Sequence, residues 1–302
     1  MIASAPIDII KLGENDFEIG IKRLDLIHPA FGGNKWYKLK YNLESARLNG
    51  HDTILSFGGS HSNHLYALAH AGCEMGFRTI GVIRGENQDS SAIQAMRACG
   101  MTLVGVSRLA YAEKETDEFK EWLHSQLGDF YLIPEGGSNF LGVNGCMEIL
   151  SAQELNEVDV IVCASGTGST AAGLLLGCPE QRILSVPVLR PELEMYHEVR
   201  KQLVYFLGEE IAVNECMDRL EIIPGYTHGG YARVTTELMS FISAFEQKYQ
   251  IPLDAVYTGK MMQAVFTLAN QGYFKDSMRV VVIHTGGLRG RCCGDVHSYR
   301  EK

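Results

Sequence analysis

Residues 31–39 are Phe31-Gly32-Gly33-Asn34-Lys35-Trp36-Tyr37-Lys38-Leu39. The two adjacent glycines allow the backbone to turn tightly or to approach a ligand closely, because neither has a Cβ atom. An apolar-spaced run starts directly after Lys35 and predicts a helix that continues to about Leu48. Lys35 would then lie at a loop-to-helix junction, where the helix dipole disfavours the ammonium form and favours the neutral amine that forms an imine. The alternative is a solvated surface lysine.

The composition is that of an ordinary globular protein. The chain has 302 residues, 46% of them hydrophobic and 21% charged, enough for one large domain or two smaller ones. The net charge of -9, without any run of Lys or Arg, argues against nucleic acid and anionic membrane as partners. The first eight residues lack the features of a signal peptide. The eight cysteines show no metal-type C-x-x-C spacing, which indicates reduced core cysteines in a cytoplasmic protein.

Apolar strand-like runs alternate with helical segments along most of the chain. This order predicts an α/β protein of two open parallel layers, with ligands in a cleft at the carboxyl ends of the strands. We expect a large domain from residues 1–45 and 134–302 and a small α/β domain from residues 46–133. Strands are expected at 17–24, 53–57, 79–83, 102–106, 130–133, 158–163, 183–189, 220–223 and 279–284, and helices at 35–48, 63–75, 90–99, 112–127, 170–176, 191–206, 235–249 and 259–271.

A glycine-rich loop, Gly166-Thr167-Gly168-Ser169-Thr170, lies between a predicted strand and a predicted helix. Backbone N–H groups, the helix dipole and three hydroxyls would form an anion site there, suited to a phosphate. The loop is not a P-loop, because no Gly-Lys-Ser/Thr follows, and its third glycine, Gly173, comes two places too late for Gly-x-Gly-x-x-Gly. A glycine turn without a ligand is the alternative. The uncharged run 160–179 around it is too polar at its centre to cross a membrane.

Three further loops contain glycine and lie beside strand-like runs. Residues 58–64, Gly-Gly-Ser-His-Ser-Asn-His, offer hydrogen-bond donors at a helix N-terminus, suited to a carboxylate. His61 and His64 lack an acidic or cysteine ligand close in sequence, so no metal is expected. The other two loops are 255–260 and 284–287. Four such loops with a candidate imine lysine describe a pocket for a phosphorylated aldehyde cofactor.

Five motifs carry a resemblance to a known family: residues 31–35, 62–63, 167–170, 256–260 and 284–287. They resemble the pyridoxal-phosphate enzymes grouped as 1-aminocyclopropane-1-carboxylate deaminase and D-cysteine desulfhydrase, which have the tryptophan-synthase-β-like fold (fold type II). The similarity extends from about Ile19 to Leu288, with the motifs in order and at similar spacings. The resemblance implies pyridoxal 5'-phosphate as cofactor, a small amino acid as substrate and a homodimer.

The resemblance also implies roles for individual residues. Lys35 would be the Schiff-base lysine, and Asn63 would hydrogen-bond the 3-hydroxyl oxygen of the cofactor. Ser62 and the amides beside it, those of Asn63 and His64, would receive the substrate carboxylate, and Ser62 or Lys35 would handle the Cα proton. The phosphate would be held by Gly166, Thr167, Gly168, Ser169 and Thr170, and the substrate side would be lined by the catalytic tyrosines Tyr226 and Tyr257.

Two positions discriminate between reactions within this family. The ring-opening deaminases resemble one another in having Glu and Leu where this chain has Thr258 and Thr285, and the D-cysteine desulfhydrases resemble one another in having hydroxyls there. A carboxylate beside the pyridine nitrogen keeps it protonated and strengthens the electron sink that a carbon leaving group needs. A thiolate leaves more easily, so a hydroxyl beside the nitrogen suffices. The threonines therefore favour β-elimination of D-cysteine to pyruvate, ammonia and hydrogen sulfide.

The chain departs from the family pattern at two places. Its N-terminal region is shorter, and residues 225–233 replace an acidic Leu-Pro-x-Glu-Gly stretch that is expected after Tyr226. Both departures lie where the substrate is expected to bind, so the cofactor follows from the motifs more directly than the substrate does. Alternatives are a deaminase of another small amino acid, including 1-aminocyclopropane-1-carboxylate, and a cofactor-binding protein without turnover. An intact Lys35, Ser62 and Tyr257 argue against the last.

Overall fold

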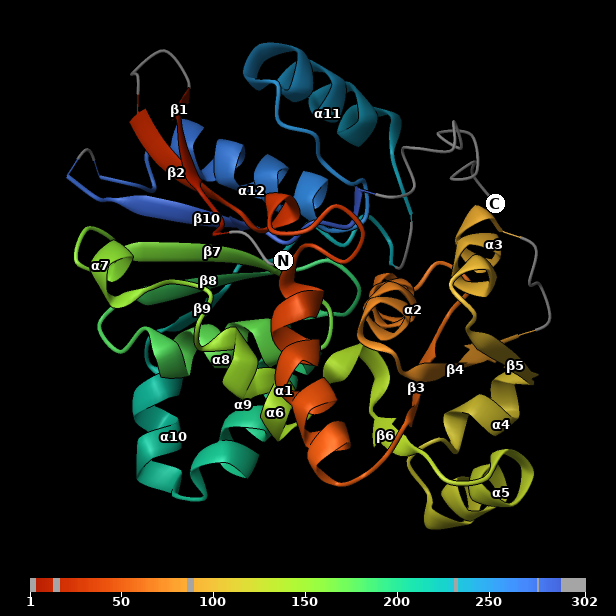
Figure 1. Ribbon diagram of the computed structural model, residues 1–302. Coiled ribbons are helices and arrows are strands. Elements are labelled where there is room, and N and C mark those ends of the chain that lie inside the picture. The colour runs from red at the N-terminus through yellow and green to blue at the C-terminus, as the bar shows by residue number, and fades with distance from the viewer. Residues whose placement is uncertain (1–3, 13–16, 86–89, 231–232, 276, 289–302) are drawn as a thin grey trace.

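The computed structural model describes residues 4–12, 17–85, 90–230, 233–275 and 277–288 (Figure 1). Two β-sheets lie side by side, with helices on both faces of each. The large sheet has six strands in the order β1-β2-β10-β7-β8-β9, and the small sheet has four in the order β5-β4-β3-β6. The large sheet contains β1 (Ile7–Leu12), β2 (Phe17–Arg23), β7 (Val160–Ser165), β8 (Arg182–Pro187), β9 (Leu220–Ile222) and β10 (Val280–His284).

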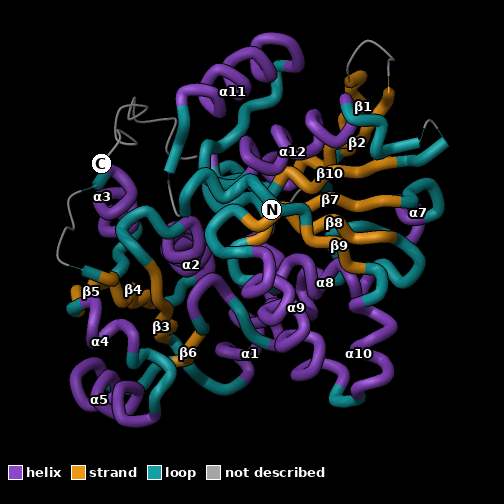
Figure 2. The backbone as a smooth tube through the Cα atoms, turned by 180° about the vertical axis from the view of Figure 1, so that it is seen from behind, coloured by secondary structure: helices purple, strands orange, loops and turns teal. Residues whose placement is uncertain are grey.

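The strands of the large sheet are parallel except at one edge, where β1 pairs antiparallel with β2. Strands β7 and β10 are buried throughout, as expected for central parallel strands covered on both faces. One face packs against α8 (Ser169–Gly177), α9 (Glu192–Leu207) and α10 (Glu210–Met217), and the other against α11 (Thr236–Tyr249) and α12 (Thr258–Asn270) (Figure 2). The sheet therefore contributes to two apolar cores.

The small sheet draws all its strands from residues 53–133: β3 (Thr53–Gly58), β4 (Arg78–Arg84), β5 (Thr102–Val106) and β6 (Tyr131–Ile133). All are parallel. Helices α2 (Asn63–Met75) and α3 (Ser91–Ala98) cover one face, and α4 (Arg108–Ala112) and α5 (Asp117–Leu127) the other. Helix α1 (Asn34–Leu48) leads from the large sheet into β3. The predicted parallel α/β fold is confirmed, while the exact domain boundaries stay a prediction.

Several elements differ from the sequence-based expectation. Strand β1 and the short helices α6 (Phe140–Cys146), α7 (Ala152–Leu155), η1 (Leu24–Leu26) and η2 (Glu135–Gly137) were not expected, nor was α10. The helix predicted at 112–127 begins only at Asp117, as α5, and α4, which ends at Ala112, was not expected. Ser107 caps α4 and Thr116 caps α5, each accepting a backbone N–H with its hydroxyl oxygen. Thr116, three residues after Glu113, thus begins a new helix as its N-cap.

The described part of the chain contains no helix long and apolar enough to cross a membrane. Within the same residues, no group of three or more His, Cys, Asp or Glu side chains is arranged to hold a metal ion. The six cysteines among them are all free thiols, and Cys146, Cys163 and Cys178 are buried.

Candidate active site

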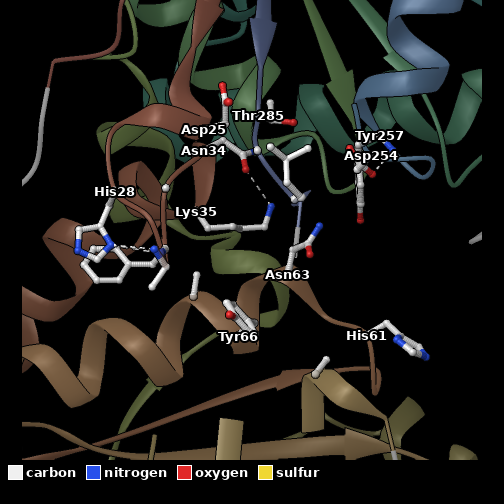
Figure 3. A pocket seen from close by; sticks show the side chains of 18 of the residues that line it. Asp25, His28, Asn34, Lys35, His61, Asn63, Tyr66, Asp254, Tyr257 and Thr285 are labelled. Carbon is white, nitrogen blue, oxygen red and sulfur yellow. Dashed lines mark hydrogen bonds between the residues drawn. The ribbon is translucent and has the colours of Figure 1, made fainter. Parts of the chain in front are cut away.

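A cavity of about 280 Å³ lies between the two sheets (Figure 3). Its wall combines residues from the start of α1 and α2, from α3, and from the loops that follow β10 and precede α12. The polar side chains that line it are Asp25, His28, Asn34, Lys35, His61, Asn63, Tyr66, Ser91, Asp254, Tyr257 and Thr285.

Lys35 enters this cavity because the glycine pair fixes the start of α1 against the end of β10. Gly33 has φ +109°, and a Cβ atom there would lie 2.3 Å from the Thr285 carbonyl oxygen, so no other residue fits. The Asn34 amide donates to the same carbonyl at 3.3 Å. The Lys35 Nζ donates to Asn34 Oδ1 at 3.3 Å, and Figure 3 shows its side chain extending between Asn34 and Asn63.

The glycine-rich loop does not line the cavity itself but adjoins it. Asn34 Nδ2 donates to Thr170 Oγ1 at 3.0 Å, which joins Lys35's neighbour to the start of α8. Lys38, one turn after Lys35, is 3% exposed, and its Nζ contacts Thr167 Oγ1 at 3.5 Å. Burial lowers the pKa of Lys38, and no carboxylate among the described residues offsets this. A buried lysine amine beside a helix N-terminus and three hydroxyls supplies donors that could hold an anion.

The loop at residues 58–64 presents His61 and Asn63 to the cavity, whereas the side chains of Ser62 and His64 are engaged elsewhere. The Ser62 Oγ accepts the Leu65 amide at 3.2 Å as the N-cap of α2. His64 is 2% exposed and its Nε2 bonds to Ser56 Oγ at 2.9 Å. Burial, together with the charges of Lys35 and Lys38, holds the pKa of His64 well below its ordinary value. The His64 side chain is therefore neutral and lies outside the cavity.

The turn before α12 presents Asp254 and Tyr257 to the cavity, while Thr258 is fully buried behind this lining. Asp254 Oδ2 accepts the amides of Val256 and Tyr257 at 2.9 and 2.8 Å. Its Oδ1 accepts the amide and the hydroxyl of Thr258, both at 2.8 Å. The four acceptor positions of the carboxylate are thus used within the turn.

A buried ionic cluster supports the loop that carries Thr285. The guanidinium of Arg23 donates two hydrogen bonds to Asp25, at 2.9 and 2.7 Å, and a third to Asp8 at 2.6 Å. His284 Nδ1 lies 3.1 Å from Asp25 Oδ1, and His284 Nε2 donates to the Pro252 carbonyl at 2.7 Å. Burial alone would raise the pKa of Asp25, but the hydrogen bonds from His284 and Arg23 lower it to about 2.

The pKa of Asp25 predicts an acid-sensitive contribution to stability. Because the folded-state pKa is about 2 against an ordinary value of 3.8, the carboxylate stabilises the fold above pH 4. That stabilisation, about 2 kcal/mol, is expected to disappear as the pH falls from about 4 to 2. Urea unfolding across this range should show the difference between wild type and Asp25→Asn shrinking by this amount. A constant difference would contradict the lowered pKa.

The predicted site residues thus separate into two groups. The cavity brings together Lys35, Asn63, Tyr257 and Thr285. Ser62, His64 and Thr258 do not line it, nor does Tyr226, which is partly buried against the apolar core beneath α12. Residues 166–170 adjoin it through Asn34 and Lys38.

The motifs alone did not identify four residues of this region: Asp25, Asn34, Lys38 and Asp254. Of these four, only Lys38 could have been predicted from the sequence, because a residue three places after Lys35 lies on the same face of the helix. The other three depend on contacts between segments far apart in the sequence.

Comparison with known proteins identifies the family of the chain. A family model described as "Pyridoxal-phosphate dependent enzyme" matches residues 7–286. A Thermotoga maritima protein, provisionally named as a 1-aminocyclopropane-1-carboxylate deaminase, is 31% identical over 287 residues, which is 91% of this chain and 90% of its own. A D-cysteine desulfhydrase of Klebsiella pneumoniae is 31% identical over 293 residues, covering 89% of this chain and 87% of its own.

Among solved structures, one described as an ACC deaminase homologue superimposes with a TM-score of 0.79 and 27% identity, covering 99% of this chain and 96% of that one. The family model spans most of the chain, and it includes every described strand and both loops that carry Lys35 and Thr285. The chain therefore belongs to the family of pyridoxal-phosphate-dependent enzymes.

Proposed function

We propose that the cavity holds pyridoxal 5'-phosphate with Lys35 as its Schiff-base lysine. The proposal is supported by the anion site beside it, where buried Lys38 has a hydroxyl but no carboxylate as partner. The phosphate would bind there, with the N-terminus of α8 and the hydroxyls of Thr167, Ser169 and Thr170. Asn63 would hydrogen-bond the cofactor ring from the small-domain side, and Thr285 from the large-domain side.

When bound, the cofactor supplies an electron sink that makes the Cα proton of an amino acid removable. The chain supplies the groups that orient the substrate and move the proton. Lys35 lines the cavity and Ser62 does not, so we assign the proton transfer at Cα to the Lys35 amine. Tyr257, also in the lining, places a hydroxyl where it can donate to the leaving group. The backbone amides at the start of α2, beside Asn63, would bind the substrate carboxylate.

The reaction that this wall supports best is β-elimination from D-cysteine. This proposal depends on the hydrogen bonds of Asp254. All four acceptor positions of its carboxylate are occupied by N–H and O–H groups of its own turn. A carboxylate so engaged has no acceptor position left for the pyridine nitrogen, and Asp25, the other carboxylate of the lining, is paired with Arg23 and His284. The Thr285 hydroxyl would then be the partner of the nitrogen. Without a carboxylate partner the electron sink is weaker, and a thiolate is the leaving group that such a sink can expel.

The net reaction balances as D-cysteine plus water giving pyruvate, ammonia and hydrogen sulfide. The Cα–H bond breaks with its proton passing to Lys35, and the Cβ–S bond breaks with its electron pair leaving on sulfur. The thiolate then takes a proton, and the released enamine is hydrolysed by water to pyruvate and ammonia. No external oxidant or reductant is required.

A comparison of initial rates on the wild-type protein tests this function. Sulfide and pyruvate release from D-cysteine should be at least about tenfold faster than ammonia release from 1-aminocyclopropane-1-carboxylate, and L-cysteine should be a poor substrate. The second candidate, ring opening, rests on the deaminase relatives and would be supported if the cyclopropane substrate were the faster. Turnover of neither substrate would overturn the proposed reaction while leaving cofactor binding intact.

The assignment of the phosphate site predicts the effect of one substitution. Lys38→Met keeps the apolar stem but removes the buried charge, so it should weaken cofactor binding by roughly 10- to 100-fold, the value of one hydrogen bond between charged groups. Titration of the apoprotein with pyridoxal phosphate measures this directly. Pyridoxal without its phosphate should bind both proteins alike. A similar loss for both ligands would mean that Lys38 acts on the fold rather than on the phosphate.

A further inference from the structure

Lys260, in the first turn of α12, is a fully buried cation outside the cavity lining. Its Nζ donates to three backbone carbonyl oxygens: Val188 at 3.3 Å, Thr227 at 2.9 Å and Gly230 at 3.3 Å. Among the described residues no carboxylate forms an ion pair with it. Burial lowers the pKa of Lys260 to about 8, although the negative charge of Asp254 acts to raise it. With this pKa the amine is mainly an ammonium at neutral pH.

This ammonium joins two segments that are far apart in the sequence. Val188 follows β8, and Thr227 and Gly230 belong to the segment that follows β9. The next residue, Leu189, reaches the active site: a Cβ atom on Gly166 would lie 3.0 Å from Leu189 Cδ1 and 3.2 Å from Tyr257 Cε1. The carbonyl ligands of Lys260 therefore lie next to the part of the wall where the glycine-rich loop meets Tyr257.

The segment that Lys260 holds has an unusual backbone. His228 has φ +51°, a left-handed conformation that costs free energy for a residue other than glycine. Its Nε2 donates to Gln263 Oε1 at 2.9 Å, and Gln263 lies one turn after Lys260 on α12. Burial and the charge of Lys260 lower the pKa of His228, so its ring is neutral. Two side chains of α12 thus fix this conformation.

A purely stabilising role does not explain a charge at this position. An ammonium in the first turn of a helix opposes the helix dipole, and its burial without a carboxylate adds a desolvation penalty. Backbone carbonyl oxygens are, however, the ligands by which proteins replace the hydration shell of a monovalent cation. The three carbonyls around Nζ have this chemistry.

We propose that the carbonyls of Val188, Thr227 and Gly230 form a monovalent-cation site that the chain fills with its own Lys260. The tethered ammonium positions residues 225–230 and Leu189 against Gly166 and Tyr257. Lys260 is thus a positioning residue for the active-site wall. The cation site itself is independent of the proposed reaction; only its consequence for Gly166 and Tyr257 rests on the proposed function.

Hydrogen exchange on the cofactor-loaded protein tests this proposal without any turnover. Lys260→Met retains the length and apolar stem but removes the cation, so the amides of residues 225–230 should exchange at least about tenfold faster, with those of β7 unchanged. Lys248→Ala, at an exposed lysine of α11, is the matched control and should leave the segment unchanged. Unchanged exchange at residues 225–230 in Lys260→Met would overturn the proposal.

Chemical rescue distinguishes a cation site from a mere packing contact. Lys260→Ala removes three methylenes and the amine, so propylammonium matches the space that it leaves. Added propylammonium should slow the exchange of residues 225–230 in Lys260→Ala towards the wild-type rate, whereas an equal concentration of neutral propanol should not. Rescue by propanol as well, or no rescue in an alanine variant whose circular dichroism matches that of wild type, would show that the charge is not what holds the segment.

Discussion

Lys35→Ala is expected to lose the visible absorbance of the lysine-bound cofactor and to reduce turnover by at least about a thousandfold, as removal of a covalent catalytic group does. The structure gives the physical reason. Lys35 is fixed by the docking of Gly33 on the Thr285 carbonyl, and its Nζ lies in the cavity within reach of Asn34. The substitution should abolish both covalent attachment of the cofactor and proton transfer at Cα, because both roles are assigned to the Lys35 amine.

Lys40→Ala is the matched control for this prediction. Lys40 lies on the same helix, and its Nζ bonds to Glu148 outside the cavity. Its removal should leave the absorbance and the rate within about twofold of wild type, because a partly exposed ion pair contributes little. Absorbance spectra and pyruvate release from D-cysteine measure both effects. Retained absorbance and turnover in Lys35→Ala would contradict the assignment.

Asp25→Asn is expected to lower the free energy of unfolding by about 3–5 kcal/mol, since it leaves buried His284 without a carboxylate and Arg23 with only the more exposed Asp8. Arg23 would lose a bidentate partner and His284 would lose its carboxylate, and the side chains of Arg23 and His284 are 8% and 0% exposed. Because His284 precedes Thr285, the cofactor affinity should fall as well. Urea unfolding at pH 7 provides the measurement.

Asp52→Asn serves as the comparison for a surface pair. Asp52 contacts Arg78 at 2.7 Å, but both side chains are 74% exposed. Such a pair contributes about 0–1 kcal/mol, so this variant should unfold close to wild type. Equal and small effects of the two substitutions would show that the buried cluster is not a principal support of the Thr285 loop.

Much of the fold was predictable because strong local signals agree with it. Helix α2 spans Asn63–Met75 as predicted, since Ser62 caps its start and Gly76 its end. The central strands were recognisable as short apolar runs. Helix α6 was not, because its sequence has two glycines and no helical periodicity. Its Gly145 is required by tertiary packing: a Cβ atom there would lie 1.8 Å from the Tyr37 carbonyl oxygen on α1.

The sequence predicted those site residues whose location depends on where a loop lies. It did not predict those whose side chain could hydrogen-bond to more than one partner. Lys35 and Thr285 line the cavity because their loops dock on each other. Thr258 was expected to face the cofactor, but its hydroxyl donates to Asp254, four residues earlier. That hydrogen bond depends on the conformation of the turn, which motif spacing does not specify. The homodimer and the cytoplasmic location stay predictions.

The position of the covalent bond to the cofactor tests the central claim most directly. Borohydride reduction of the yellow holoenzyme, followed by proteolysis and mass spectrometry, identifies the lysine that carries the pyridoxyl group. Lys38 is the competing candidate, because it is buried, has a lowered pKa and lies one helical turn away. The account predicts the label on Lys35 and an unmodified Lys38. A label on Lys38, on Lys260 or on any other lysine would contradict it.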